Sequence, residues 1–328
     1  MKTNLQCKSN KKIYITDCDM SNINPEIEVF KNHKFDYELL TCQNEQDVIA
    51  QCKNAIAVVN QYAPMTESVF KNLPNLKMIV RYGVGVDNID VAAATKYGVQ
   101  ICNVPDYGTE EVADHAVALM MTLTRKIFSS VPLVKSGIWD YAKSAPILRF
   151  NQMTVGIIGA GRIGKSFARI VHGMGCKIIA YDAFVKQEQL PDYITLVSQE
   201  TVFQNADVIS LHCFLNKETE NLVNKNTLKL MKKTAFLINV ARGGLVDEDA
   251  LADAIQQGDI AGAGLDVVKK EPLPKNHKFN TFENILVTPH AAWYSESAYI
   301  DLKTKCAEEA VRFMEGKPVR CPINDLNK

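Results

Sequence analysis

Short apolar runs alternate with longer helix-compatible stretches along most of the chain. Several of the runs are continuously apolar, as expected of strands that are covered on both faces. The predicted strands include Lys12–Thr16, Ala55–Val59, Lys77–Val80, Val155–Ile158, Ile178–Tyr181, Val208–Leu211, Ala235–Asn239 and Ile285–Thr288. The predicted helices include Glu110–Thr124, Arg162–His172, Glu248–Gln257 and the amphipathic Glu296–Met314. This alternation predicts an α/β protein with parallel sheets and helices on both faces.

Chain length and the distribution of glycines predict two domains. The 328 residues exceed the usual size of one hydrophobic core. The glycine-rich turns and the charged candidate residues gather between about 150 and 290, whereas a smaller alternating unit precedes them. A central domain inserted into a discontinuous outer one fits this layout.

Composition indicates a protein with a small-molecule partner. The 37 basic and 37 acidic side chains cancel, so nothing indicates nucleic acid as a partner. The nine cysteines form no CxxC pair, which favours free thiols in a reducing cytoplasm over disulfides or a metal site. Residues Met1–Asn10 lack an apolar signal segment, and no window approaches the ~20 apolar residues of a membrane span. We therefore expect a cytoplasmic protein that binds neither a membrane nor a metal.

The segment Thr154–Asp182 carries a dinucleotide-binding pattern. An apolar strand leads into Gly159, Gly161 and Gly164, and a helix and a second strand ending at Asp182 follow. The first glycine permits a tight turn, the second lets the backbone approach a pyrophosphate, and the third allows close helix–strand packing. The alternative is an ordinary turn with a chance acid after it.

Asp182 bears on which cofactor binds. A carboxylate at this position accepts hydrogen bonds from the ribose hydroxyls and repels the 2′-phosphate of NADP, so NAD is expected. Lys186 lies nearby and leaves some tolerance of NADP open.

Three charged residues lie at or beyond predicted strand ends. Arg242 follows one strand, Glu271 lies beyond the GAGLDV run, and His290 follows another strand. Arginine can clamp a carboxylate and polarise a carbonyl, histidine can exchange a proton near neutral pH, and glutamate can orient the imidazole. Each alone has a structural alternative, but together they predict keto acid reduction.

The sequence resembles the D-isomer-specific 2-hydroxyacid dehydrogenase family over essentially its whole length. The resemblance rests on Arg81–Asp90 (RYGVGVDNID), Gly156–Gly164 with Asp182, Asn239–Asp247 (NVARGGLVD), Gly264–Pro272 (GLDVVKKEP) and Pro289–Trp293 (PHAAW). It implies that Arg242 binds the substrate carboxyl group, that His290 is the acid/base, and that Glu271 supports it. It also implies two Rossmann-like domains. A doubly wound NAD-binding domain, residues 106–291, is inserted into a discontinuous flavodoxin-like substrate domain, residues 1–105 and 292–328.

Further roles follow from the same resemblance. The expected cofactor-binding residues are Gly159, Gly161, Arg162, Ile163, Gly164, Asp182, Thr109, Ala241 and Asp266, the last near the nicotinamide carboxamide. The expected substrate-binding residues are Arg81, Tyr82, Gly83, Val84, Gly85 and Trp293. An interdomain cleft is expected to close around the substrate. A homodimer paired through the NAD-binding domain, around Lys126–Phe150, is expected as well.

The substrate is left open by the sequence. Trp293 favours an apolar substituent unless it only packs a helix start, whereas Arg81 could bind a phosphate, as in 3-phosphoglycerate. Arg81 and the stretch after His290 look like the C-terminal-binding-protein branch, which allows an NAD(H)-sensing dimeric interaction protein as the alternative. A formate- or phosphite-oxidising relative is a weaker third possibility.

Two further residues are singled out, one in a loop and one on a predicted helix. Phe214 stands where the family often has proline in the loop that flanks the adenine. His115 lies on an apolar helix and is interpreted as a satisfied packing residue.

Overall fold

The computed structural model describes residues 12–20 and 22–326, so the prediction for Met1–Asn10 lies outside the described residues. The chain forms two compact units. Unit 1 runs to Gly108 and resumes at Ser295, and unit 2 comprises Thr109–Tyr294. The sequence placed these boundaries at 105/106 and 291/292, three residues earlier at each crossing.

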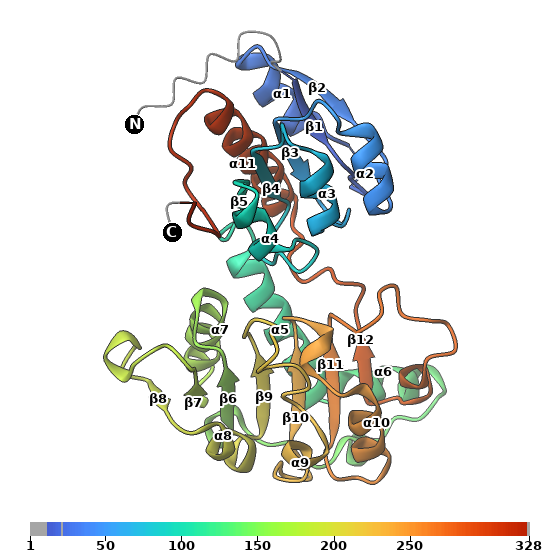
Figure 1. Cartoon of the computed structure of the whole chain (residues 1–328). Helices are drawn as coiled ribbons and strands as arrows, with labels where there is room; N and C mark the ends of the chain where they lie inside the picture. The colour runs from blue at the N-terminus through green and yellow to red at the C-terminus, as the bar shows by residue number, and fades with distance from the viewer. Residues whose placement is uncertain (1–11, 21, 327–328) are drawn as a thin grey trace. The chain divides into compact units, whose positions relative to one another are not determined.

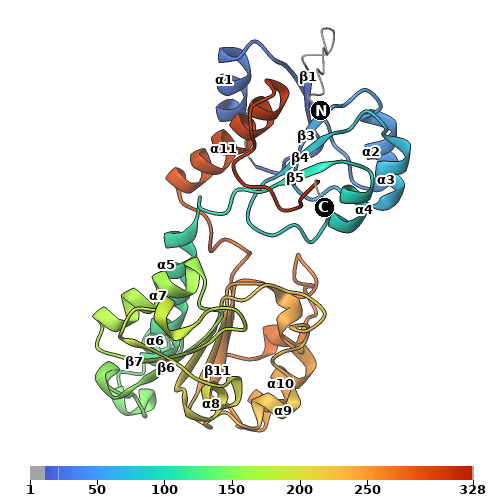
Figure 2. The same ribbon diagram turned by 60° about the vertical axis from the view of Figure 1, so that its left-hand side comes forward.

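Unit 1 is built on a parallel five-stranded sheet in the order β2-β1-β3-β4-β5. This is the flavodoxin-like strand order. Helices α1 and α11 cover one face of the sheet, and α2, α3 and α4 cover the other (Figures 1 and 2). The elements are β1 (Lys12–Ile15), α1 (Asn24–Asn32), β2 (Asp36–Leu39), α2 (Glu45–Gln51), β3 (Ala57–Asn60), α3 (Glu67–Asn72), β4 (Met78–Arg81), α4 (Val91–Lys96), β5 (Gln100–Cys102) and α11 (Glu296–Met314).

Unit 2 contains a parallel seven-stranded sheet in the order β12-β11-β10-β9-β6-β7-β8. The first strand, β6, lies beside the fourth, β9, which is the reversal of strand order found in doubly wound nucleotide-binding folds. Its elements are α5 (Thr109–Thr124), α6 (Ile127–Lys135), β6 (Thr154–Ile158), α7 (Arg162–Gly173), β7 (Lys177–Tyr181), β8 (Ile194–Leu196), α8 (Gln199–Asn205), β9 (Val208–Leu211), α9 (Lys225–Leu228), β10 (Phe236–Asn239), α10 (Glu248–Gln256), β11 (Gly262–Leu265) and β12 (Ile285–Val287). The predicted α/β class with two Rossmann-like sheets is confirmed.

Both faces of the unit 2 sheet are covered. Helices α5 and α7 pack over one face, whose core includes Met120, Leu123 and Phe167. Helices α8 and α10 pack over the other, with Phe203 and Leu251 in the core. The central strands β9, β10 and β11 are buried along their whole length, and their residues other than the buried Ser210 and Asn239 are apolar or glycine.

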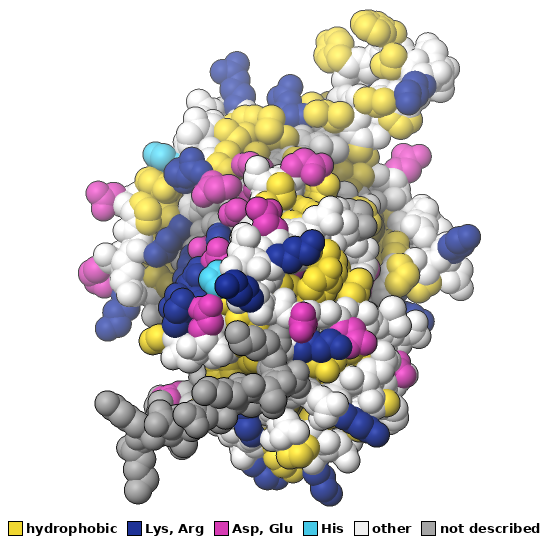
Figure 3. All heavy atoms as spheres, turned by 90° about the horizontal axis from the view of Figure 1, so that it is seen from above, with side chains coloured by type: hydrophobic (Ala, Val, Ile, Leu, Met, Phe, Trp, Pro, Cys, Tyr) yellow, Lys and Arg dark blue, Asp and Glu magenta, His cyan; other side chains and the backbone are white. Residues whose placement is uncertain are grey.

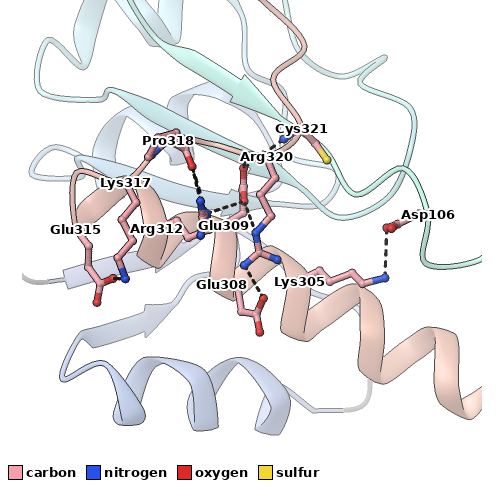
Figure 4. A network of polar contacts seen from close by, with 10 residues as sticks. All are labelled: Asp106, Lys305, Glu308, Glu309, Arg312, Glu315, Lys317, Pro318, Arg320 and Cys321. Carbon is pink, nitrogen blue, oxygen red and sulfur yellow. Dashed lines mark hydrogen bonds and ion pairs between the residues drawn. The ribbon is translucent and has the colours of Figure 1, made fainter.

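The C-terminal segment is fixed to unit 1 by a polar network (Figure 4). The buried carboxylate of Glu309, on α11, accepts the backbone N–H groups of Arg320 and Cys321. Asn324 then accepts from the Ile101 N–H at 2.8 Å and donates to the Val99 carbonyl at 2.9 Å. These contacts attach the segment to both α11 and β5.

Charged and apolar side chains are mixed on one face of the molecule (Figure 3). The face in Figure 3 shows basic, acidic and apolar side chains interspersed. Over the described ranges, no single helix is long and apolar enough to cross a membrane. Helices α5 and α6 reach the required length and apolarity only when taken together, and they are bent by 56°.

Candidate active site

The candidate residues of unit 2 lie along one edge of its sheet. Because all seven strands are parallel, their carboxyl ends meet at the same edge. Asp182 follows β7, the glycine-rich turn follows β6, and Arg242 follows β10. Glu271 and His290 follow the neighbouring strands β11 and β12. The edge therefore runs from the predicted cofactor residues to the predicted catalytic ones.

The glycine-rich turn has geometry that larger residues could not adopt. Gly159 has a φ of +97°, and a Cβ there would lie 2.6 Å from the backbone of both His212 and Cys213. A Cβ on Gly164 would overlap the carbonyl oxygen of Gly159. The first glycine thus allows the turn, and the last allows α7 to start directly against it.

The start of α7 fits a dinucleotide pyrophosphate. Gly161 caps this twelve-residue helix without any side-chain hydrogen bond, and a Cβ on Gly161 would meet nothing within 4 Å. The N–H groups at the helix start, which include those of Arg162 and Ile163, have no partner within the helix. Open space beside such N–H groups suits a phosphate anion.

Asp182 connects β7 to the glycine-rich turn. One carboxylate oxygen accepts from the Ala160 N–H at 2.7 Å, and the other accepts from the N–H groups of Phe184 and Val185 at 2.8 and 3.0 Å. These three bonds fix an acidic group where an adenosine ribose is expected. A carboxylate has further lone pairs with which to accept ribose hydroxyl groups.

The loop after β9 also approaches the turn. His212 bonds the Ser210 hydroxyl through Nε2 at 2.8 Å, and burial lowers its pKa to about 3, so the imidazole is neutral. Phe214, at the position where the family that the sequence resembles often has proline, is 72% exposed, and Phe184 is 87% exposed. Both aromatic rings therefore extend into solvent from loops beside the glycine-rich turn.

Glu271 and His290 form a close pair. Nδ1 of His290 lies 2.6 Å from a carboxylate oxygen of Glu271, whose other oxygen accepts from the Val268 N–H at 3.1 Å. Burial raises the pKa of Glu271. Three neighbours together outweigh burial and lower this pKa overall. They are His290, through its hydrogen bond and charge, the Val268 N–H, and the charge of Arg242. Glu271 is therefore an ionised acceptor that fixes which imidazole nitrogen faces it.

Arg242 is held in a turn that packs against the Glu271 loop. The side chain of Asn239 donates to the Arg242 carbonyl at 2.8 Å and accepts from the Ala241 N–H at 3.1 Å. A Cβ on Gly243 would overlap the backbone of Val268. The glycine after Arg242 thus brings the two loops into contact.

Asp266 anchors the loop that carries His290. Its carboxylate is 1% exposed and accepts from the Thr288 hydroxyl at 2.6 Å and from the N–H groups of Ala291 and Ala292 at 3.0 and 2.8 Å. Within this loop, His290 has a φ of +55°, in the left-handed region. Non-glycine residues hold that conformation only where their surroundings impose it, at about 1–3 kcal/mol.

Unit 2 thus brings together Arg242, Glu271, His290 and Asp266 at adjacent strand ends, with Ala241 beside Arg242. Thr109 is the first residue of α5. Trp293 packs edge-to-face on Tyr294, with ring centroids 5.6 Å apart.

The predicted substrate loop belongs to unit 1. Arg81 ends β4, and residues 82–85 follow it. Tyr82 is buried and donates to Glu26 at 2.5 Å, and Gly83 has a φ of +114°. The Val84 carbonyl accepts from the side chain of Asn103 at 2.6 Å.

Sequence reasoning missed one pair of residues near the substrate loop. Glu26 and Lys303, 3.0 Å apart, are buried beneath Tyr82. Because they are far apart in sequence, no local signal identified them. His115, which the sequence indicated to be a satisfied packing residue, has a hydrogen-bond partner in the Thr288 hydroxyl.

Comparisons with known proteins agree on a family. Residues 117–292 match the sequence profile described as D-isomer specific 2-hydroxyacid dehydrogenase, NAD binding domain. The chain is 40% identical to the D-3-phosphoglycerate dehydrogenase of Synechocystis sp. over 79% of its own length and 47% of that protein's. It is 38% identical to the glycerate dehydrogenase of Methylorubrum extorquens over 83% of its length and 87% of that protein's.

A solved structure is similar over nearly the whole chain. An acyclic imino acid reductase (Bsp5), in complex with NADPH and D-Arg, superposes with a TM-score of 0.87 at 28% identity, covering 95% of this chain and all of the other. The chain spans about half the length of the phosphoglycerate dehydrogenases that it matches.

Proposed function

This chain belongs to the D-isomer specific 2-hydroxyacid dehydrogenase family, and from that premise we propose that it interconverts a small 2-keto acid and its 2-hydroxy acid with NAD(H). The observation that carries the proposal is the 2.6 Å pair of His290 and Glu271 at adjacent strand ends of an NAD-binding sheet. Arg242 follows the next strand along the same edge.

The cofactor is NAD, and its binding residues are proposed from the geometry of unit 2. The backbone from Gly161 to Gly164 would hold the pyrophosphate, and Asp182 the adenosine ribose. Thr109, Ala241 and Asp266 are proposed nearer the nicotinamide. Bound NADH would supply the hydride that the substrate carbon accepts.

The proposed chemistry of the protein groups is acid/base and electrostatic. With Nδ1 engaged by Glu271, Nε2 of His290 is the nitrogen that gives a proton to the carbonyl oxygen during reduction and takes it back during oxidation. The ionised Glu271 stabilises the imidazolium form. The Arg242 guanidinium binds the substrate carboxylate and polarises the carbonyl. The roles of Arg81–Gly85 and Trp293 on the substrate stay predictions.

A homodimer is proposed through α6 and the segment after it. Ile127, Val131 and Val134, at positions i, i+4 and i+7 of α6, lie on one helix face and are 48%, 47% and 49% exposed. Farther on, Trp139 and Tyr141 are 89% and 93% exposed. Apolar surface of this extent favours burial against a second copy of the chain.

A cytoplasmic location is proposed from the thiols. Eight cysteines fall within the described residues, and all are free rather than paired in disulfides. Free thiols on this scale suit a reducing compartment.

The test is NADH oxidation, followed by absorbance, against glyoxylate, pyruvate, hydroxypyruvate, phenylpyruvate, 4-methylthio-2-oxobutyrate and 3-phosphohydroxypyruvate. Efficient turnover of one of the first five supports the proposal and names the substrate. Preference for 3-phosphohydroxypyruvate would instead assign a 3-phosphoglycerate dehydrogenase. Tight NADH binding without turnover of any compound would favour the NAD(H)-sensing alternative.

A further inference from the structure

His115, on α5, reaches the loop that carries His290. Its Nε2 lies 3.0 Å from the Thr288 hydroxyl and 3.6 Å from the nearer carboxylate oxygen of Asp266. All of these residues belong to unit 2. Nothing in the proposed reaction uses His115, so its contact with this loop calls for a separate role.

The hydrogens along this contact can be assigned by counting donors. The Thr288 hydroxyl has one hydrogen, which it donates to Asp266 over 2.6 Å. Its oxygen must then accept from His115, so Nε2 of His115 carries a hydrogen. The result is a directed chain from His115 through Thr288 to a buried carboxylate, in which each bond polarises the next.

The same carboxylate determines the backbone around His290. Asp266 accepts the N–H groups of Ala291 and Ala292, and its own carbonyl accepts the His290 N–H at 2.9 Å. His290, with its φ of +55°, lies between Thr288 and these alanines. A shift of the Asp266 carboxylate would therefore move the histidine relative to Glu271.

We propose that His115 is a positioning residue that, through Thr288 and Asp266, holds His290 in its left-handed conformation. The inference rests on the proposed role of His290 as acid/base. Groups of this kind, which orient a reacting residue without touching substrate, change rates by about 10–100-fold in metal sites, and misplacement by about 1 Å has a similar effect.

The test compares variants at the first two residues of the chain of hydrogen bonds, His115 and Thr288. Thr288→Val removes the Thr288 hydroxyl at nearly constant volume. His115→Leu removes the imidazole N–H that donates to this hydroxyl. His115→Gln retains an N–H near the Nε2 position. His172→Leu, an exposed helical histidine of the same unit, is the matched control. Each protein is saturated with NADH, and deuterium uptake of a peptide covering residues 289–293 is measured beside kcat, KM, the NADH Kd and Tm.

We expect Thr288→Val and His115→Leu to speed uptake in that peptide and to lower kcat about 10–100-fold, with a much smaller change in the Kd of NADH. His115→Gln should retain most of kcat, and the double variant should lose no more than the worse single variant, because both act on one chain of bonds. Unchanged uptake in Thr288→Val would overturn the proposal. So would a double variant whose loss equals the product of the two single losses.

Failure of the proposed function would look different. A wild-type protein that turns over none of the keto acids would remove the catalytic role of His290. Deuterium uptake would still decide whether His115 and Thr288 hold the loop.

Discussion

The carboxylate of Asp182 accepts a hydrogen bond from the backbone N–H of Ala160 over 2.7 Å, so the residue expected to contact the ribose also closes the glycine-rich turn. Its substitution therefore affects two things, namely the charge that opposes a 2′-phosphate and the shape of the turn. Variants that separate charge from hydrogen bonding can distinguish the two.

Asp182→Ala should lower the preference for NADH over NADPH by about 10–100-fold, the range for loss of hydrogen bonds to a charged group. It should also weaken NADH binding, because the turn loses its bond to β7. Asp182→Asn is the nearest control, since its amide oxygen can still accept from Ala160 while the charge and the acceptor for the Phe184 and Val185 N–H groups are lost. Kinetics with each cofactor measure the effect. An unchanged preference in both variants would mean that another residue contacts the ribose.

His290→Ala should lower turnover about 100- to 10,000-fold, the usual range for loss of a general acid/base. The Kd of NADH should stay nearly the same, because the imidazole acts on the substrate. Steady-state kinetics and NADH fluorescence titration measure the two quantities. Loss of NADH affinity as large as the loss of turnover would contradict this role.

Glu271→Gln should shift the pH dependence of reduction. The pKa of Glu271 lies below its ordinary value, because the His290 contacts, the Val268 N–H and Arg242 outweigh burial. The stabilisation that the charge of Glu271 contributes is therefore fully present above the ordinary glutamate pKa and is lost as pH falls through the lowered pKa. Glu271→Gln has no such charge to lose, so the acid limb of kcat/KM that the wild type shows as Glu271 becomes protonated should be absent from the variant. Superimposable pH profiles would contradict the pairing. The side chains are more than a third exposed, so folding stability should change little.

Lys303→Met should strongly destabilise unit 1. Lys303 and Glu26 are both fully buried, and removing one partner leaves an uncompensated charge, which costs about 3–5 kcal/mol. Adding Glu26→Gln should restore part of the loss. Lys96→Met, which breaks the exposed pair with Glu67, is the control and should cost less than about 1 kcal/mol. Urea unfolding measures each value. Equal effects of Lys303→Met and Lys96→Met would show that burial does not govern this pair.

Val131→Glu combined with Val134→Glu should convert a dimer to a monomer, because two charges would be placed on the exposed apolar face of α6. Leu230→Glu, at another exposed apolar position, should leave the dimer intact. Sedimentation or light scattering gives the mass. A wild-type monomer, or a variant that remains dimeric, would contradict the proposed interface.

The sequence predicted several of the buried strands well, because Val208–Leu211 and Phe236–Asn239 are mostly apolar and are buried on both faces. It did not single out β2, whose sequence DYEL is largely exposed at the sheet edge, or the three-residue edge strands β5 and β8. A short edge strand carries no such apolar signature. It also did not single out the buried β11, because its sequence GAGL lacks β-branched residues.

Within the candidate site, the glycines and charged residues could be predicted because each follows a recognisable strand. The role of Asp266 in the His290 loop could not. Its partners Thr288, Ala291 and Ala292 lie more than twenty residues away, and only the folded chain shows that both carboxylate oxygens are engaged. His115 is similar, since its contact with Thr288 spans 173 positions.

The left-handed backbone at His290 keeps a side chain needed for activity in a conformation that lowers stability. Glycine and asparagine adopt a φ of +55° more readily than histidine does, so either would relax this loop. Random mutagenesis selected for thermal resistance alone should therefore enrich replacements at position 290 and yield sturdier but inert proteins. Replacing His290 would stabilise the folded loop and at the same time remove the side chain that the reaction needs.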